Sequence, residues 1–124
     1  MDYRGKVHLN FVFKANAEDV AEGDRLFARH NAWMARTHHR EGNKALLTYN
    51  VSKGDDLSNS LDPSSAPTGK TIYVLDEIYE STAGIEDHWQ QAMSSWEDFK
   101  DFMAWAQKCE ISAQHSGTVI NSLW

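Results

Sequence analysis

The sequence has little of what would tie a protein to a disulfide framework, a nucleic acid or a membrane. Cys109 is its single cysteine, so no disulfide can form within the chain. Acidic residues outnumber basic ones by 18 to 12, which argues against a nucleic-acid partner because phosphate binding needs a basic surface. No basic amphipathic stretch and no apolar run of membrane-spanning length is present, so we expect no membrane partner. The first residues lack a signal-peptide core, and we expect a cytoplasmic protein.

What the sequence does contain predicts one compact unit. Its 124 residues are enough to bury a single hydrophobic core, and five tryptophans supply large apolar surfaces for that core, a pocket or an interface. No linker or internal repeat divides the chain. We therefore expect a single domain over residues 1–124.

Hydrophobic spacing predicts the order strand, helix, strand, strand, helix, strand. Strands are expected at residues 7–13, 45–52, 71–80 and 111–124, the last with a bulge at Gly117. A long helix is expected over 17–41, and a second from Thr82 with a break at 94–98. A loop is expected over about 53–70. This order is the α+β, ferredoxin-like βαββαβ arrangement, a four-stranded antiparallel sheet with both helices on one face.

The first strand has two faces of very different character. Strict alternation puts four apolar side chains on one face and His8 and Asn10 on the other; the apolar residues are Val7, Leu9, Phe11 and Phe13. Helices would cover only one side of the sheet. We expect the apolar set to lie on the bare side and to be covered by a second copy in a homodimer. On that reasoning His8 and Asn10 point under the helices.

Residues 71–102 resemble the third strand and second helix of the dimeric α/β-barrel superfamily, in particular its antibiotic-biosynthesis monooxygenase branch. The matching positions are Glu77, Tyr79, Glu80 and His88. The resemblance implies a homodimer with a small-molecule pocket between sheet and helices in each subunit. It also implies roles for His8, which resembles a first-strand His of the polyketide-cyclase branch, and for Asn10, which resembles an Asn of the haem-degrading branch. Haem itself is disfavoured, because residues 96–99 carry no His.

His88 is the first candidate for catalysis, because imidazole titrates near neutrality and can act as a base. The resemblance implies a monooxygenase that needs no cofactor and acts on an aromatic or polyketide-like substrate. His88 would remove a proton, Asn10 would hold the anion's oxygen, and dioxygen would attack the anion; His8 is a further catalytic candidate on the same strand face as Asn10. The alternatives are a non-catalytic ligand-binding or stress-response barrel, or a cyclase or isomerase on the same fold. In those cases His88 could be a structural histidine bonded to the backbone.

Other side chains are candidates for the pocket wall. The stripe of the first helix contains His30, Trp33 and Met34, which form either core or pocket lining. Tyr79 and Trp89 complete the predicted ligand-binding set. We expect no metal site, because His38 and His39 are adjacent on a helix and point apart, and because no carboxylate or cysteine lies at ligand spacing from them or from His30.

Overall fold

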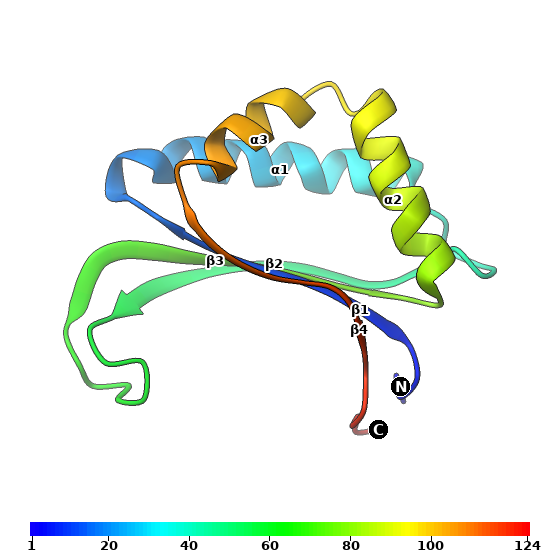
Figure 1. The fold of residues 1–124 in the computed structure, drawn as a ribbon, viewed down its shortest axis with the longest axis horizontal. Helices are drawn as coiled ribbons and strands as arrows, with labels where there is room; N and C mark the ends of the chain where they lie inside the picture. The colour runs from blue at the N-terminus through cyan, green and yellow to red at the C-terminus, as the bar shows by residue number, and fades with distance from the viewer.

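The computed structural model describes residues 1–124, in which one antiparallel sheet carries helices on a single face (Figure 1). The sheet order is β2-β3-β1-β4. The strands are β1 (Val7–Ala15), β2 (Leu46–Leu57), β3 (Pro67–Tyr79) and β4 (Glu110–Thr118), and the helices are η1 (Ala17–Asp19), α1 (Val20–Thr37), α2 (Thr82–Ser95) and α3 (Phe99–Ala106). The predicted α+β order is confirmed. None of the helices combines the length and apolar character needed to span a membrane.

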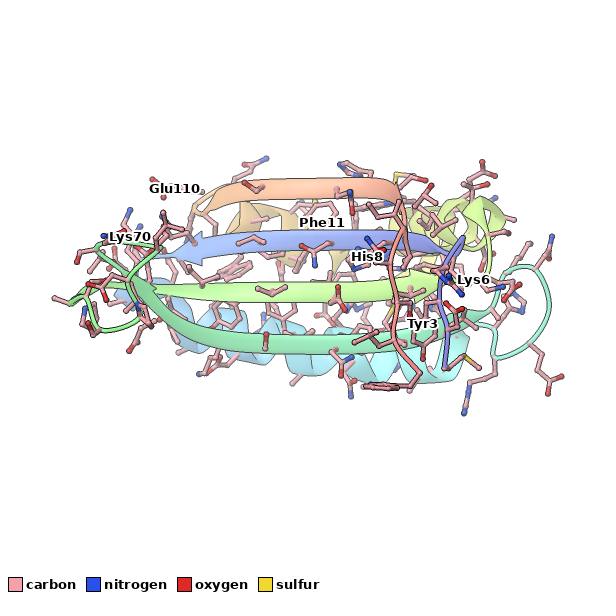
Figure 2. The ribbon with its side chains drawn as sticks, turned by 90° about the horizontal axis from the view of Figure 1, so that it is seen from below. Tyr3, Lys6, His8, Phe11, Lys70 and Glu110 are labelled. Carbon is pink, nitrogen blue, oxygen red and sulfur yellow. The ribbon has the colours of Figure 1, made fainter.

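The two faces of β1 are the reverse of those expected from the sequence: the apolar face lies under the helices, and the polar face is the open one. Leu9 and Phe13 are fully buried beneath the helices, whereas His8 contacts Asp76 on the open face of the sheet (Figure 2). Asn10 lies on the same open face and also contacts Asp76. The physical reason is the apolar area: two phenylalanines, a leucine and a valine stabilise the fold most when they line the chain's own core. The apolar face of β1 therefore leaves no bare patch for a partner.

The connection between β2 and β3 is a long hairpin and not the long loop expected over 53–70. Pairing continues through Lys53↔Tyr73, Gly54↔Ile72 and Asp55↔Thr71, and only residues 58–66 lie outside the strands. Pro67 does not prevent this pairing, because it stands at the first residue of β3, where a strand tolerates proline.

The first helix is shorter than predicted. A single 3₁₀ turn occupies residues 17–19, and α1 ends at Thr37 because His38 adopts an extended backbone conformation. Gly42 takes a positive φ in the following loop and does not cap the helix. The predicted break in the second helical region is confirmed, since α2 ends at Ser95 and α3 begins at Phe99. The predicted bulge is confirmed too, as the β1–β4 register shifts next to Gly117.

The core lies between the sheet and the helices in two aromatic clusters. The larger one packs Phe13 against Phe27, Phe102 and Trp105. The smaller one consists of Trp33, Met34, Ala92 and Trp96. On α3 the Met103 side chain is 40% exposed, whereas Trp105 turns inward. The polar site described next lies beside the smaller cluster.

Candidate functional site: a buried histidine and glutamate cluster

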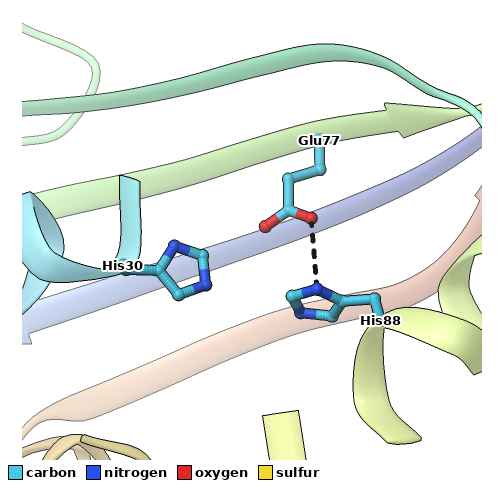
Figure 3. Close-up of side chains that lie close together, drawn as sticks. All are labelled: His30, Glu77 and His88. Atoms are coloured by element: carbon cyan, nitrogen blue, oxygen red, sulfur yellow. Dashed lines mark ion pairs between the residues drawn. The ribbon is translucent and has the colours of Figure 1, made fainter. Parts of the chain in front are cut away.

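Three ionisable side chains from three different elements converge inside the core. His30 comes from α1, Glu77 from β3 and His88 from α2, and their donor atoms all lie within 4.8 Å of one another (Figure 3). His88 Nδ1 is 4.0 Å from Glu77 Oε1. All three residues are buried, with Glu77 at 0% exposure. We call this set the buried cluster.

Ordinary secondary-structure periodicity creates the buried cluster. Alternation along β3 turns Glu77 to the helix side with its neighbours Leu75 and Tyr79. His30 occupies the buried stripe of α1. The helix α2 comes close enough to present His88 because of Gly84: a Cβ at this position would lie 2.7 Å from Tyr79 Cδ1 and 2.9 Å from Lys44 O. A larger residue would push the first turn of α2 off the sheet.

Glu77 is a buried acid without a basic partner. The Tyr79 hydroxyl donates a hydrogen bond of 2.5 Å to Glu77 Oε1, whereas Oε2 has no hydrogen-bond partner. No lysine or arginine pairs with this carboxyl group; the histidine at 4.0 Å is its nearest basic neighbour. Burial raises the pKa of Glu77 to about 7, and the Tyr79 hydrogen bond opposes this effect. Glu77 can therefore gain or lose a proton near neutral pH.

The histidines around Glu77 are neutral at neutral pH. Burial lowers the pKa of His30 to about 3 and that of His38 to about 4, and it holds the pKa of His88 well below its ordinary value. Burial disfavours the imidazolium form because the core solvates charge poorly. A neutral imidazole keeps one nitrogen lone pair, which can accept a proton or bind a metal ion.

Hydrogen bonds assign the tautomers of two of these rings. Thr37 Oγ1 donates to the Trp33 carbonyl, so it accepts a hydrogen bond from His38 Nδ1. His38 Nε2 then accepts from His88 Nδ1 at 2.8 Å. This chain leaves the lone pair of His88 on Nε2. His30 is held separately, through a 2.8 Å bond between its Nδ1 and the Tyr49 hydroxyl.

A small cavity adjoins the buried cluster. Its volume is about 30 Å³, and its wall contains His30, His88, Trp89 and Trp96. That volume suits a water molecule or a molecule of similar size and not an aromatic ring. The indole N–H of Trp96 is buried without an acceptor, so an unpaired donor lies in the same region. The cavity can thus accept a small polar group beside two imidazoles.

A larger groove runs outside the core between α1 and the edge strand β2. It consists of two hollows of about 260 and 550 Å³ that meet at Asn31 and Tyr49. His38 lines the smaller hollow. The groove is linked to the buried cluster at two points, since Tyr49 contacts His30 and His38 contacts His88. A molecule in the groove would therefore contact the outer ends of the same network.

The predicted catalytic residues do not come together. His88 lies in the buried cluster as expected, but His8 and Asn10 are on the opposite face of the sheet, where both contact Asp76. The expectation that they share a pocket with His88 is therefore wrong. It failed because it assigned the apolar face of β1 to a partner instead of to the core.

The predicted pocket-lining residues occupy three different places. His30 and Trp89 line the small cavity, and Met34 lines the groove. Trp33 belongs to the smaller core cluster, and Tyr79 acts through its hydrogen bond to Glu77. The residues that sequence reasoning missed as site members are Glu77, His38 and Tyr49. For Glu77 there was a signal, because a carboxylate alternates there with Tyr73, Leu75 and Tyr79 on a buried strand face.

Comparison with known proteins supports the fold. No protein-family model matches the chain, and no curated protein sequence matches it. Among solved structures, the chain resembles a "putative antibiotic biosynthesis monooxygenase" from Deinococcus radiodurans, with a TM-score of 0.55 and 22% identity over 95% of this chain and 99% of that one. The chain has the ferredoxin-like α+β fold. The sheet of this ferredoxin-like chain is open and not closed into a barrel, and at this identity the match carries no activity with it.

Proposed function

We propose that the chain is an enzyme that oxygenates a small aromatic or polyketide-like molecule, with His88 as the base. The observation that carries the proposal is the orientation of this ring. His38 holds its Nδ1, its Nε2 keeps the lone pair, and the ring lines a cavity next to a carboxyl group. Orientation in one tautomer is one requirement of a general base. A second is stabilisation of the imidazolium, which here must come from the Glu77 carboxylate because burial lowers the pKa of His88.

The reaction would begin with proton transfer from a phenol or hydroquinone to His88 Nε2. The imidazolium formed there would lie close to the Glu77 carboxylate, 4.0 Å from Nδ1, which offsets its charge in the poorly solvated core. The Trp96 N–H is free to donate to the anion's oxygen, a role that the sequence had given to Asn10. Dioxygen would then take an electron from the anion and combine with a ring carbon as a peroxide, which the His88 imidazolium protonates. Loss of one water from this hydroperoxide leaves a quinone, so one oxygen atom enters the product and the other leaves as water. A ring can enter only if the cavity widens, and Trp89 and Phe99 are partly exposed lining residues that could move.

The test measures oxygen uptake by the purified protein with a panel of small phenols and hydroquinones. We expect His88→Gln to lower kcat by roughly 10² to 10⁴, the usual contribution of a general base. His8→Gln is the matched control, because this histidine lies on the other face of the sheet and should leave turnover unchanged. Equal turnover in wild type and His88→Gln would remove His88 from the mechanism.

A second candidate function is ligand binding without catalysis. It is favoured by the location of the large hollows, which lie in the α1–β2 groove and not at His88. Volumes of a few hundred Å³ suit a small organic molecule. The test measures binding of the same compounds to the wild type and to Asn31→Trp. Binding that the substitution abolishes, with no oxygen uptake by the wild type, would support ligand binding over oxygenation.

The homodimer also stays a proposal, now on a different surface from the one expected. The open face has an apolar centre on two neighbouring strands, consisting of Val12, Ile72, Val74 and Ile78, beside the polar group of His8, Asn10 and Asp76. A second copy of the same face could cover the apolar centre. Light scattering at micromolar concentration should give a dimer mass that Val74→Asp reduces to that of a monomer. A monomer mass for the wild type would contradict the proposal.

A further inference from the structure

The orphaned oxygen of Glu77 points to a missing partner. This carboxyl group is fully buried, receives one hydrogen bond from Tyr79 and has nothing bonded to Oε2. A buried acid without a lysine or arginine must either stay protonated or meet another cation. The only candidates within reach are a proton, an imidazolium ion or a metal ion.

Two imidazoles supply the other donors that a metal ion would need. His30 and His88 approach Glu77 from α1 and α2, so that two nitrogens and one oxygen lie within 4.8 Å of one another. The sequence argument against a metal considered spacing along the chain around His30, His38 and His39. It did not test this set, because the three donors are on separate elements. An imidazole binds a metal ion through the lone pair of its unprotonated nitrogen.

We propose that His30, Glu77 and His88 bind one divalent transition-metal ion. Two histidines and one carboxylate are the donor set of mononuclear iron(II) sites, and zinc accepts it too. Metal–ligand bonds of about 2.0–2.2 Å bring donors to roughly 3 Å from one another, so the three side chains must close around the ion by rotamer shifts. His88 Nδ1, which is 4.0 Å from Glu77 Oε1, is bonded to His38, so His88 would turn to bind the ion through Nε2, the nitrogen that keeps the lone pair. The ion would replace the proton on Glu77 and would supply the cation that this carboxylate lacks.

The surroundings fit such a centre. The 30 Å³ cavity is lined by both histidines and has room for a water or dioxygen molecule at an open coordination position. Each imidazole also has a partner outside the set: His30 is bonded to the Tyr49 hydroxyl and His88 to His38. Partners of this kind orient ligating histidines and fix their tautomers. His38 and Tyr49 also line the α1–β2 groove, so the outer partners are in reach of a bound organic molecule.

This inference goes beyond the proposed function, because metal binding needs no turnover. In the metal-loaded chain His88 is a ligand, so the base of the proposed function would act in the metal-free chain. The experiment uses the full chain, stripped with a chelator and titrated with cobalt(II) alone. We expect one ion per chain, visible absorption bands typical of a cobalt site with nitrogen and oxygen ligands, and a rise in Tm. Glu77→Gln and His30→Gln should each weaken binding by at least about 100-fold.

The open face provides the matched controls. His8→Gln and Asp76→Asn remove a histidine and a carboxylate that also lie in contact, but outside the core, and should bind cobalt(II) as the wild type does. Far-UV circular dichroism and cooperative unfolding show whether each variant folds. If either Glu77→Gln or His30→Gln fails to fold, the other variant still tests the site. Substoichiometric binding by the wild type, or binding that persists in both Glu77→Gln and His30→Gln, would overturn the inference.

The assay of oxygen uptake separates the two proposals. Suppose that the chelator-treated protein holds no metal and turns over, and that added cobalt(II) or iron(II) neither binds nor changes the rate. His88 would then act as a free base, and the metal site would be overturned. Tight metal binding without oxygen uptake retains the metal site and removes the proposed oxygenation.

Discussion

Asp76 and Glu77 are neighbours on β3, and the comparison between them shows how one strand builds two kinds of site. Both carboxyl groups lie beside a histidine, His8 for Asp76 and His88 for Glu77. The side chain of Asp76 is 35% exposed on the open face, whereas Glu77 is 0% exposed under the helices. The same residue types one position apart therefore meet water in one case and an aromatic core in the other.

The difference in solvation decides what each pair can do. Water screens the Asp76 pair, and pairs of this kind stabilise a fold by at most about 1 kcal/mol. The core cannot solvate the Glu77 carboxylate, and its pKa is raised to about 7 as a result. The covered carboxyl can therefore exchange a proton near neutral pH. Only the covered face combines reactive groups with a space for a ligand.

The largest expected effect tests which face of β1 is the core face. Phe13 packs against Phe27, Phe102 and Trp105, so Phe13→Ala should lower the free energy of unfolding by about 3–5 kcal/mol. Val12→Ala, one residue away on the open face, should cost less than about 1 kcal/mol because that side chain loses little buried area. Urea denaturation measures both. Equal losses would mean that a partner covers the open face as fully as the helices cover the other.

Sequence patterns predicted the elements well, because periodicity is a local property. The alternation of residues 7–13 and the stripe containing Phe27, His30 and Met34 depend only on the chain's own spacing. Which face of β1 turns inward is not a local property, since both faces alternate equally well. The choice depends on where the helices pack. Assigning the apolar face to an unseen partner reversed the positions of His8 and Asn10.

The candidate site was only partly accessible to sequence reasoning. His88 stood out because it matches the pattern of the resembled family and because imidazole can act as a base near neutral pH. Its contacts with His30 and Glu77 come from elements that are far apart in the chain, and no spacing rule links residues 30, 77 and 88. The hydrogen bond from His88 to His38 depends on the extended backbone at His38, where a longer helix was expected.

The second prediction concerns pH and compares the buried histidines with Glu77 in the metal-free chain. The folded-state pKa values of His30, His38 and His88 lie below 6.5, so their contribution to stability is present above pH 6.5 and is lost as the pH falls. Glu77 acts in the opposite direction: its pKa is raised from 4.5 to about 7, so its contribution is present below pH 4.5 and is lost as the pH rises towards 7. The three histidines together change the free energy of unfolding with pH more than Glu77 changes it in the opposite direction.

We therefore expect the free energy of unfolding to fall by about 1–3 kcal/mol per pH unit as the pH decreases from 6.5 towards 4.5. His38 contributes least, because it lines the groove and is partly solvated. Urea titrations at several pH values in the presence of a chelator measure the slope. His30→Gln should reduce it by up to about 1.4 kcal/mol per pH unit, and an unchanged slope would show that His30 is protonated in the folded chain.

The smallest expected effect returns to the two neighbouring carboxylates. Tyr79→Phe removes the one hydrogen bond that Glu77 receives and should cost about 1–3 kcal/mol, because a buried polar group then loses its partner. Asp76→Asn leaves a partly exposed site that water can solvate and should cost less than about 1 kcal/mol. Thermal and urea unfolding of both variants in one buffer measure the difference. A larger loss of unfolding free energy in Asp76→Asn than in Tyr79→Phe would mean that the open face is buried in solution. A second copy of the chain, and not the helices alone, would then determine how the two carboxyl groups differ.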